Sequence, residues 1–270
     1  MAEIKEMARK IREDIIEMLT MAKSGHPGGS LSAADIMAVL FFNEMRIDPA
    51  NKDWPERDRF VLSKGHAAPV YYAALANKGF FPREELLQLR KTGHFLQGHP
   101  DMKKVPGVDM STGSLGQGIS AAAGMALAGK IDKKSFRVYC LLGDGEMAEG
   151  LVWEAAMAAS HYKLDNLQAI LDYNGLQIDG TNKEVMDSSP LNDKWKAFGW
   201  NVLEVDGHDI EEIKEALEIS KNLKGKPTII IAKTIKGKGV SFMENQAGWH
   251  GSAPSPEQAE LALAELKGGK

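Results

Sequence analysis

The chain has 270 residues, of which 43% are hydrophobic and 26% charged, and this ordinary globular composition excludes disorder over most of its length. Its 33 lysines and arginines against 37 aspartates and glutamates give a net charge of −4, which argues against a dedicated nucleic-acid-binding protein. The single cysteine, Cys140, excludes an intramolecular disulfide and a cysteine-based zinc site, and we expect it to be an inert core residue.

The first part of the chain is expected to be mainly helical. Apolar residues at spacings of three and four predict an amphipathic helix over residues 3–23, which ends at the glycine-rich stretch 24–30. The next predicted elements are a helix over 32–44, a strand over 58–63, and helices over 67–77, 83–90 and 116–129. A passage rich in glycine, proline and histidine, residues 92–112, separates the last two of these helices.

Strands and helices alternate in the second half of the chain. Strands are expected over 137–142, 167–173, 201–205 and 228–232, with helices over 151–162, 210–223 and 255–266. This alternation predicts an α/β fold, a doubly wound and mostly parallel sheet with helices on both faces. We expect a single domain over residues 1–270, with ligand-binding loops at the carboxyl ends of the strands.

Two polar residues stand at the ends of predicted neighbouring strands. Asp144 lies between Gly143 and Gly145, and Asn174 follows it by thirty residues at the end of the next strand. Asp144 alone could equally be a helix N-cap. Neighbouring parallel strands would however bring both side chains to one sheet edge, and their oxygens suit Mg²⁺ or Ca²⁺. Magnesium takes its other ligands from water and phosphates, so the pair indicates a metal-bridged diphosphate site.

Six short motifs of the chain occur together in the order typical of one enzyme family. They are SGHPGGS (24–30), SKGHA (63–67), GHP (98–100), TGSLGQG (112–118), GDGEMAEG (143–150) and WHG (249–251). With Asn174, this set resembles the transketolase family of thiamine diphosphate enzymes, and the resemblance covers nearly the whole chain. It implies a thiamin-diphosphate-binding fold that corresponds to the first of three transketolase domains, the diphosphate-binding (PP) domain.

The resemblance also implies roles for individual residues. Asp144, the Asn174 side chain and the main-chain carbonyl of Leu176 would bind the metal, Mg²⁺ or Ca²⁺. Asn174 and Gly145 would also approach the cofactor, thiamine diphosphate. The path of the aminopyrimidine and diphosphate groups would be lined by Gly113, Ser114 and Leu115. Many relatives carry isoleucine where Leu176 stands, but a backbone ligand tolerates that change.

Five further residues are assigned to catalysis by the same resemblance. His66 and His250 would contact the cofactor diphosphate or the bound intermediate, and His26 and His99 would meet the sugar hydroxyls and carbonyl. Glu149 resembles the family glutamate that reaches across the dimer axis and couples two active sites. Because glycines flank these four histidines, they could instead simply lie in turns.

Other polar residues leave two interpretations open. His94 could pack rather than bind, His208 could serve at a helix start, and His161 is expected to be structural or at an interface. The loop that contains Lys233 and residues 236–239 resembles the family segment KTxKGKG, but it could equally be a solvated surface loop. No two histidines have the helical i, i+4 spacing of a zinc site, which makes that alternative weak.

The function implied by the resemblance is transfer of a two-carbon ketol unit from a ketose phosphate to an aldose phosphate. The chain would be the N-terminal subunit of a split transketolase, active only with a partner chain that carries the pyrimidine-binding and C-terminal domains. We expect a heterotetramer that self-associates through the dimer axis and takes sugar phosphates as substrates. No membrane-spanning run or signal peptide is recognisable, so a cytoplasmic setting is expected, without membrane or nucleic-acid partners.

Two alternatives remain at this stage. Within the wider family, the chain could belong to a deoxyxylulose-phosphate synthase-like or dehydrogenase E1-like enzyme, although the motif GHPGGS favours transketolase. Outside catalysis, it could be a binding module that keeps the fold. The intact set of Asp144, Asn174 and the histidines argues against such a decayed module.

Overall fold

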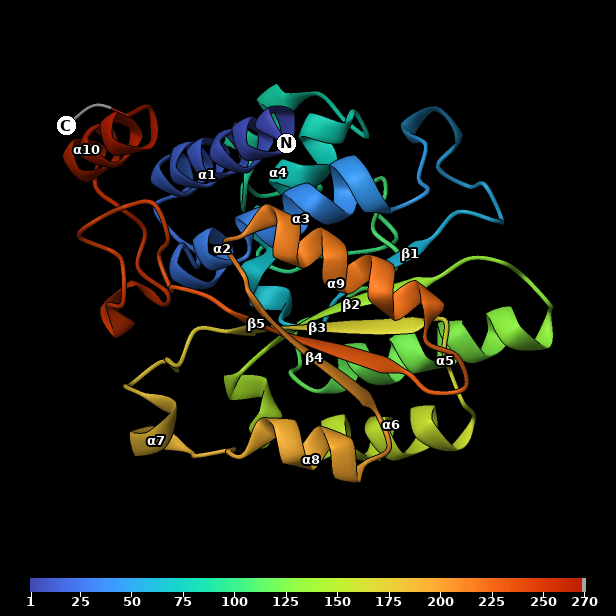
Figure 1. Cartoon of the computed structure of the whole chain (residues 1–270). Helices are drawn as coiled ribbons and strands as arrows, with labels where there is room; N and C mark the ends of the chain where they lie inside the picture. The colour runs from blue at the N-terminus through green and yellow to red at the C-terminus, as the bar shows by residue number, and fades with distance from the viewer. Residues whose placement is uncertain (269–270) are drawn as a thin grey trace.

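The computed structural model describes residues 1–268 and has a five-stranded, entirely parallel sheet at its centre (Figure 1). The strand order is β1-β2-β3-β5-β4. The strands are β1 (Arg59–Leu62), β2 (Val138–Gly143), β3 (Leu167–Tyr173), β4 (Asn201–Asp206) and β5 (Thr228–Lys233). The predicted fold class is therefore confirmed, and each strand lies within one residue of its predicted bounds. The expected single domain stays a prediction, and its last two residues lie outside the described part.

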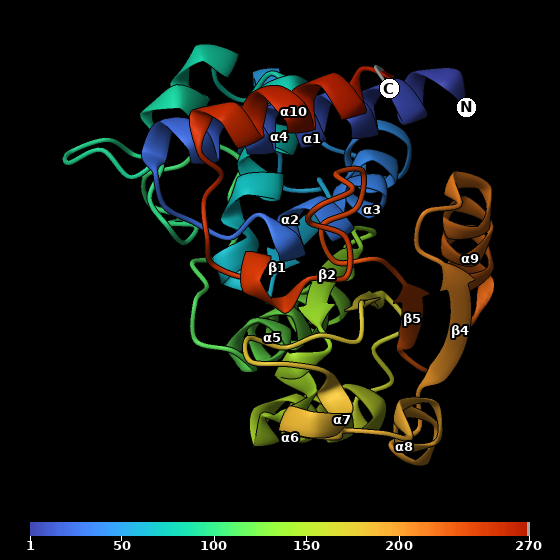
Figure 2. The ribbon, with the colours of Figure 1, turned by 90° about the vertical axis from the view of Figure 1, so that its left-hand side faces the viewer.

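Helices cover both faces of the sheet, as Figures 1 and 2 show. One layer holds α1 (Ala2–Ala22), α2 (Gly28–Ser32), α3 (Ala34–Val39), α4 (Ala68–Lys78), α9 (Ile210–Asn222) and α10 (Pro256–Leu266). The opposite layer holds α5 (Gln117–Ile131), α6 (Gly150–His161) and α8 (Leu191–Ala197). The one-turn helix α7 (Asn182–Val185) lies beside this layer, at the lower left of Figure 1. Among the described residues, no helix is long and apolar enough to cross a membrane.

Alternation along the strands divides the core into two apolar clusters. In β3, Ile170 packs into the cluster beneath α1, α3 and α4, whereas Ala169 and Leu171 pack into the cluster beneath α5 and α6. Both faces of the central strands are buried, which explains their nearly continuous apolar sequences. Cys140 lies in the second cluster, where burial raises the pKa of its thiol well above the ordinary value, as expected for an inert core residue.

The helix predicted over 32–44 is wrong in its bounds and continuity. The chain forms α2, then α3, and then a π-helical turn over Leu40–Glu44. Helix α2 begins earlier than expected, at Gly28, because Pro27 has helical backbone angles and a Cβ atom at Gly28 would lie 3.0 Å from the Lys236 side chain. Close packing against another loop therefore overrides the low helix propensity of glycine. The segment predicted as a helix over 83–90 is a 3-10 helix, Arg83–Gln88.

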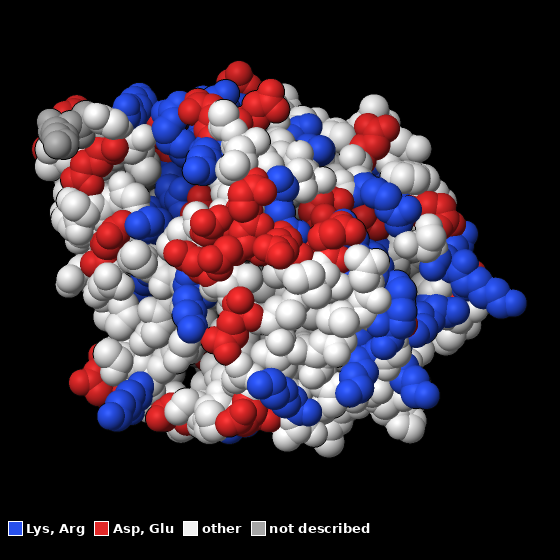
Figure 3. Space-filling model, in the orientation of Figure 1, with Lys and Arg blue, Asp and Glu red and all other residues white. Residues whose placement is uncertain are grey.

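Charge is unevenly spread over the visible face of the molecule. Figure 3 shows acidic side chains gathered over α9, whose exposed residues include Glu211, Glu212, Glu215 and Glu218. A polyanion such as nucleic acid would be repelled from this face. The arrangement agrees with the net charge and gives no support to nucleic-acid binding on this side.

Candidate functional site

A cavity of about 340 Å³ opens among loops that follow the carboxyl ends of the sheet strands. Nine of the twelve predicted site residues line it, namely His26, His66, Gly113, Leu115, Asp144, Gly145, Asn174, Leu176 and His250. They come from separate loops, which the parallel strands β1, β2 and β3 bring to one edge. The structure thus places most of the residues that the motifs singled out around a single space, as expected for a doubly wound sheet.

Asp144 is buried at the end of β2 and is held by backbone and amide donors. Its Oδ1 accepts a hydrogen bond from the Gly145 amide at 2.9 Å, and its Oδ2 accepts bonds from the Gly175 amide at 2.6 Å and Asn182 Nδ2 at 3.0 Å. Burial and, to a lesser extent, the nearby Asp172 charge raise the pKa of Asp144 to about 6, although those hydrogen bonds act to lower it. A cation beside this carboxylate would stabilise its charged form and lower its pKa.

The other two predicted metal ligands lie next to Asp144. Asn174 Oδ1 accepts a hydrogen bond from the Leu176 amide at 3.2 Å, and the Leu176 carbonyl accepts one from Lys236 Nζ at 3.3 Å. The carbonyl that should bind a metal therefore already faces a positive charge. Within residues 1–268 no three His, Cys, Asp or Glu side chains form a metal cage. A carboxylate, an amide oxygen and a carbonyl fit Mg²⁺ that shares its other ligands with water and phosphate.

Lys236 is a site residue that the sequence left undecided. It is only 2% exposed, and its Nζ also lies 3.0 Å from Nδ1 of His250. Burial lowers the pKa of Lys236 to about 8, against the attraction of Asp144. Lys233, the last residue of β5, is instead exposed and pairs with Glu204. One of the two lysines is thus solvated, and the other supplies positive charge to the cavity.

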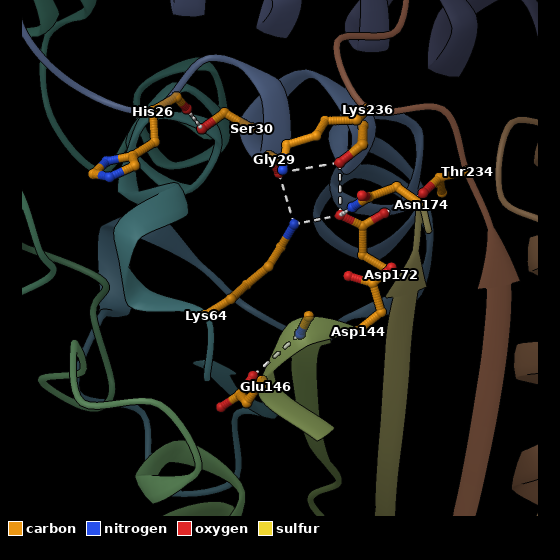
Figure 4. Close-up of polar contacts among 12 residues, drawn as sticks. His26, Gly29, Ser30, Lys64, Asp144, Glu146, Asp172, Asn174, Thr234 and Lys236 are labelled. Carbon is orange, nitrogen blue, oxygen red and sulfur yellow. Dashed lines mark hydrogen bonds and ion pairs between the residues drawn. The ribbon is translucent and has the colours of Figure 1, made fainter. Parts of the chain in front are cut away.

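Lys64, which lines the cavity, forms a buried ion pair with Asp172 that the sequence analysis missed (Figure 4). Lys64 Nζ lies 2.5 Å from Asp172 Oδ2 and donates to the Gly29 carbonyl at 2.6 Å. Asp172 also accepts hydrogen bonds from Ser32 and Thr234. Burial alone would raise the pKa of Asp172, but Lys64 and the hydroxyl donors outweigh burial and lower it. The ion pair and the Thr234 hydrogen bond thus connect the loop after β1, the end of β3 and the segment after β5.

Glu146 is a second residue without an expected role. It is buried, and it accepts hydrogen bonds from Ser63 Oγ at 2.5 Å, the Gly116 amide at 2.7 Å and the Gly143 amide at 3.1 Å. Burial raises its pKa despite these bonds. Glu146 thereby joins the two glycine-rich loops at the cavity. Its place in GDGEMAEG, two residues after Asp144, was the available sequence signal.

Three predicted histidines form one cluster. The ring centroids lie 5.2 Å apart for His26 and His66, 5.4 Å for His26 and His250, and 5.2 Å for His66 and His250. Burial lowers the pKa of His26 and His250 to about 4 and that of His66 to about 2. All three rings are therefore neutral at pH 7. His26 Nδ1 is buried without a hydrogen-bond partner among the described residues.

The remaining three predicted residues do not line the cavity. His99 is exposed beside Gly113, where a Cβ atom would lie 3.1 Å from its ring. Ser114 is exposed at the rim. Glu149 is also exposed, with its Cβ 2.9 Å from the position that a Cβ at Gly116 would take. Roles for these residues in binding or coupling stay predictions.

The other histidines separate according to their contacts. His94 packs on Phe95 and bonds to Glu85 at 2.8 Å, which supports the packing interpretation. His161 lies exposed in the last turn of α6, beside Tyr162. His208 does not cap α9, because Asp209 does so, and it bonds to other elements instead.

The fold and the cavity together define a thiamine-diphosphate-binding type of domain. Residues 3–267 match the family model described as transketolase, thiamine diphosphate binding domain. The chain belongs to the transketolase family and represents its N-terminal domain, so the predicted resemblance is confirmed.

Relatives of two lengths match the chain. It is 49% identical over 98% of its length to the 6-deoxy-6-sulfo-D-fructose transketolase subunit SqwG of Clostridium sp. (strain MSTE9), covering 96% of that protein. It is 48% identical to transketolase of Homo sapiens, covering 97% of this chain and 42% of the human one. The crystal structure of transketolase from Campylobacter jejuni superimposes with a TM-score of 0.94 at 34% identity, covering 99% of this chain and 43% of that one.

Proposed function

We propose that the chain is the N-terminal subunit of a two-subunit transketolase that uses thiamine diphosphate and Mg²⁺. It would transfer a two-carbon ketol unit from a ketose phosphate to an aldose phosphate. The observation that carries this proposal is the single cavity lined by Asp144, Asn174, Leu176 and the histidine cluster. Relatives named as transketolase subunits, 49% and 46% identical to this chain, support the split arrangement.

The diphosphate of the cofactor fits the metal side of the cavity. Asp144, Asn174 and the Leu176 carbonyl would hold Mg²⁺, and Lys236 would turn its ammonium from that carbonyl towards a phosphate oxygen. A side chain at Gly145 would crowd this part of the cavity, because a Cβ there would lie 3.2 Å from Gln177, which also lines it. When bound, thiamine diphosphate supplies the nucleophilic carbon and the electron sink that amino acid side chains lack.

The histidine cluster would serve the substrate and the proton transfers. A neutral imidazole both donates and accepts a hydrogen bond, so His26, His66 and His250 can orient hydroxyls and pass protons without a fixed positive charge. The unbonded Nδ1 of His26 is free for such a partner. His99 would assist from beside Gly113, which lies close to its ring.

The other half of the active site would come from a partner chain with the pyrimidine-binding and C-terminal domains. Two copies of each chain would form a heterotetramer. Glu149 is exposed and would meet its symmetry mate near the two-fold axis, where two carboxylates can share a proton and couple the sites. We place this assembly in the cytoplasm, acting on sugar phosphates and without membrane or nucleic-acid partners.

A ketol-transfer assay tests the proposal. The purified chain should show no turnover alone, and activity should appear when a chain that carries the missing domains is added. Substantial turnover without a partner would show that the split-subunit proposal is wrong. Cofactor binding with no activity in the assembled complex would instead favour a binding module or a different thiamine diphosphate reaction.

A further inference from the structure

Outside the cavity, His208 bonds to two elements that are far apart in the sequence. Its Nδ1 lies 2.8 Å from Oδ2 of Asp35 on α3, and its Nε2 lies 2.9 Å from the backbone nitrogen of Ile235, just after β5. The side chain is 13% exposed. The imidazole therefore bridges the helical layer and the loop that leads to Lys236.

The partners fix the tautomer of His208. A backbone N–H can only donate, so Nε2 must carry a lone pair, and the ring proton must be on Nδ1, where it is donated to Asp35. Asp35 also pairs with Arg12, whose Nη1 and Nη2 lie 3.2 Å and 2.5 Å from its two oxygens. The chain Arg12–Asp35–His208 is consequently a fixed, directional hydrogen-bonded series that ends at the Ile235 amide.

Ile235 immediately precedes Lys236, and several hydrogen bonds hold the backbone of this short segment. The Thr234 amide donates to the Tyr173 carbonyl, the Ile235 carbonyl accepts from the Lys238 amide, the Lys236 carbonyl accepts from the Asn245 amide, and the Gly237 amide donates to the Gly28 carbonyl. These four bonds join backbone to backbone. The bond at the Ile235 amide is instead provided by a side chain, so it can be altered by substitution.

We propose that His208 is a positioning residue that sets the backbone at Ile235 and thereby directs the Lys236 side chain into the cavity. The inference rests on the proposed function in one respect, because it takes the cofactor diphosphate as the group that Lys236 serves. The observed hydrogen bonds of Lys236 do not depend on that function. Lys236 Nζ reaches the carbonyls of Leu176 and Gln177, at 3.3 Å and 3.4 Å.

A purely structural brace between α3 and the sheet would use the same contacts, and two matched substitutions separate the roles. His208→Gln keeps an oxygen near the position of Nε2 that can accept from the Ile235 amide. His208→Asn keeps an N–H near the position of Nδ1 that can donate to Asp35. A brace to α3 depends on the Asp35 bond, whereas positioning of Lys236 depends on the Ile235 bond.

The experiment measures thiamine diphosphate affinity in Mg²⁺ by calorimetry, on the full chain or the assembled enzyme. His208→Asn should weaken binding about tenfold, the low end for outer partners of a metal site, and His208→Gln should stay close to wild type. In the Lys236→Met background, His208→Asn should cause no further loss of cofactor affinity, because both substitutions act on the same interaction of Lys236 with the cofactor. Equal effects of the two His208 variants, or additive losses in the double variant, would overturn the proposal.

Nuclear magnetic resonance of the free chain keeps the test independent of cofactor binding. The ¹⁵N shifts of His208 should show the Nδ1–H tautomer, and a Nε2–H tautomer would overturn the proposal even if the Asn variant fails to fold. The Lys236 ammonium resonance should shift in His208→Asn and remain in place in His208→Gln. A wild-type chain that binds no thiamine diphosphate would contradict the proposed function, while this resonance would still decide the role of His208.

Discussion

The two sides of the cavity handle polar groups in opposite ways. On the metal side, formed by Asp144, Asn174, Leu176 and Lys236, each polar side chain has at least one partner within the chain. On the histidine side, formed by His26, His66 and His250, the three rings lie together, and the His26 Nδ1 atom is buried without a hydrogen-bond partner among the described residues. The chain thus satisfies its charges internally and leaves neutral imidazoles for a ligand.

Physical chemistry explains this difference. An unpaired buried charge costs several kcal/mol, so carboxylates and ammonium groups must be compensated before any ligand binds. An imidazole avoids this cost by losing its proton, and burial accordingly lowers the pKa of His26, His66 and His250. We therefore expect substitutions on the metal side to affect cofactor binding strongly, and those on the histidine side to act more mildly.

The largest effect is expected from Asp144→Ala. The variant loses the one carboxylate of the proposed metal site, and Mg²⁺-dependent binding of thiamine diphosphate should be abolished. Because the carboxylate has a raised pKa and contributes no ion pair, the fold should persist. Calorimetry and circular dichroism together check both statements. Undiminished cofactor affinity in this variant would sink the metal assignment.

The next effect concerns stability. Lys64→Met leaves Asp172, which is 0% exposed, without its cation, and we expect a loss of about 3–5 kcal/mol in the free energy of unfolding. The matched control is Lys233→Met, which removes the exposed pair with Glu204 and should cost at most about 1 kcal/mol. Urea denaturation measures both variants. Similar losses would show that the buried pair has no special structural role.

The histidine side predicts a dependence of stability on pH. With folded-state pKa values of about 4 for His26 and His250 and about 2 for His66, the unfolded chain binds more protons as pH falls below 6.5. Stability should therefore be fully present above pH 6.5 and decline towards pH 4. After allowance for partial exposure, we expect His66→Asn to reduce this decline by about 1 kcal/mol, or about 2–4 °C in melting temperature.

Carboxylates also titrate in this pH range, so the informative quantity is the difference in melting temperature between wild type and His66→Asn. Thermal melts of wild type and His66→Asn at several pH values between 4.5 and 7.5 provide it. Parallel curves for the two proteins would mean that burial does not keep the His66 ring neutral.

The smallest catalytic effect is expected at His99, which is exposed and does not line the cavity. In the assembled enzyme, His99→Ala should raise the KM for sugar phosphate about fivefold, the value of one hydrogen bond, with less change in cofactor affinity. His161→Ala should change neither quantity, because the side chain is exposed at the end of α6. An inactive but folded His161→Ala enzyme would overturn this ranking.

Local sequence patterns predicted the parts of the fold that depend on periodicity and on motifs. The bounds of the strands were predicted to within one residue, because their apolar runs end at glycines or polar residues. The motifs also identified Asp144 and Asn174, since β2 and β3 are neighbours in the sheet. Cavity residues that belong to the short motifs could therefore be predicted without a structure.

Residues defined by tertiary contacts were not accessible in this way. Asp172 lies inside an apolar strand, and only the fold reveals that Lys64 reaches it from another loop. Lys236 and Lys233 have the same charge and similar neighbours in sequence, yet one is buried and the other exposed. The early start of α2 likewise depends on packing of Gly28 against Lys236, which no local propensity encodes.

The most direct test of the central claim, that the metal side recognises a metal-bound diphosphate, is a competition titration on the purified chain. Thiamine diphosphate should bind in Mg²⁺ and lose affinity when the metal is chelated, and pyrophosphate with Mg²⁺ should displace it. Thiamine without phosphate groups should bind far more weakly, because Asp144, Asn174, Leu176 and Lys236 would have nothing to hold. Equal binding of thiamine and thiamine diphosphate, or binding that is unaffected by chelation, would contradict the account.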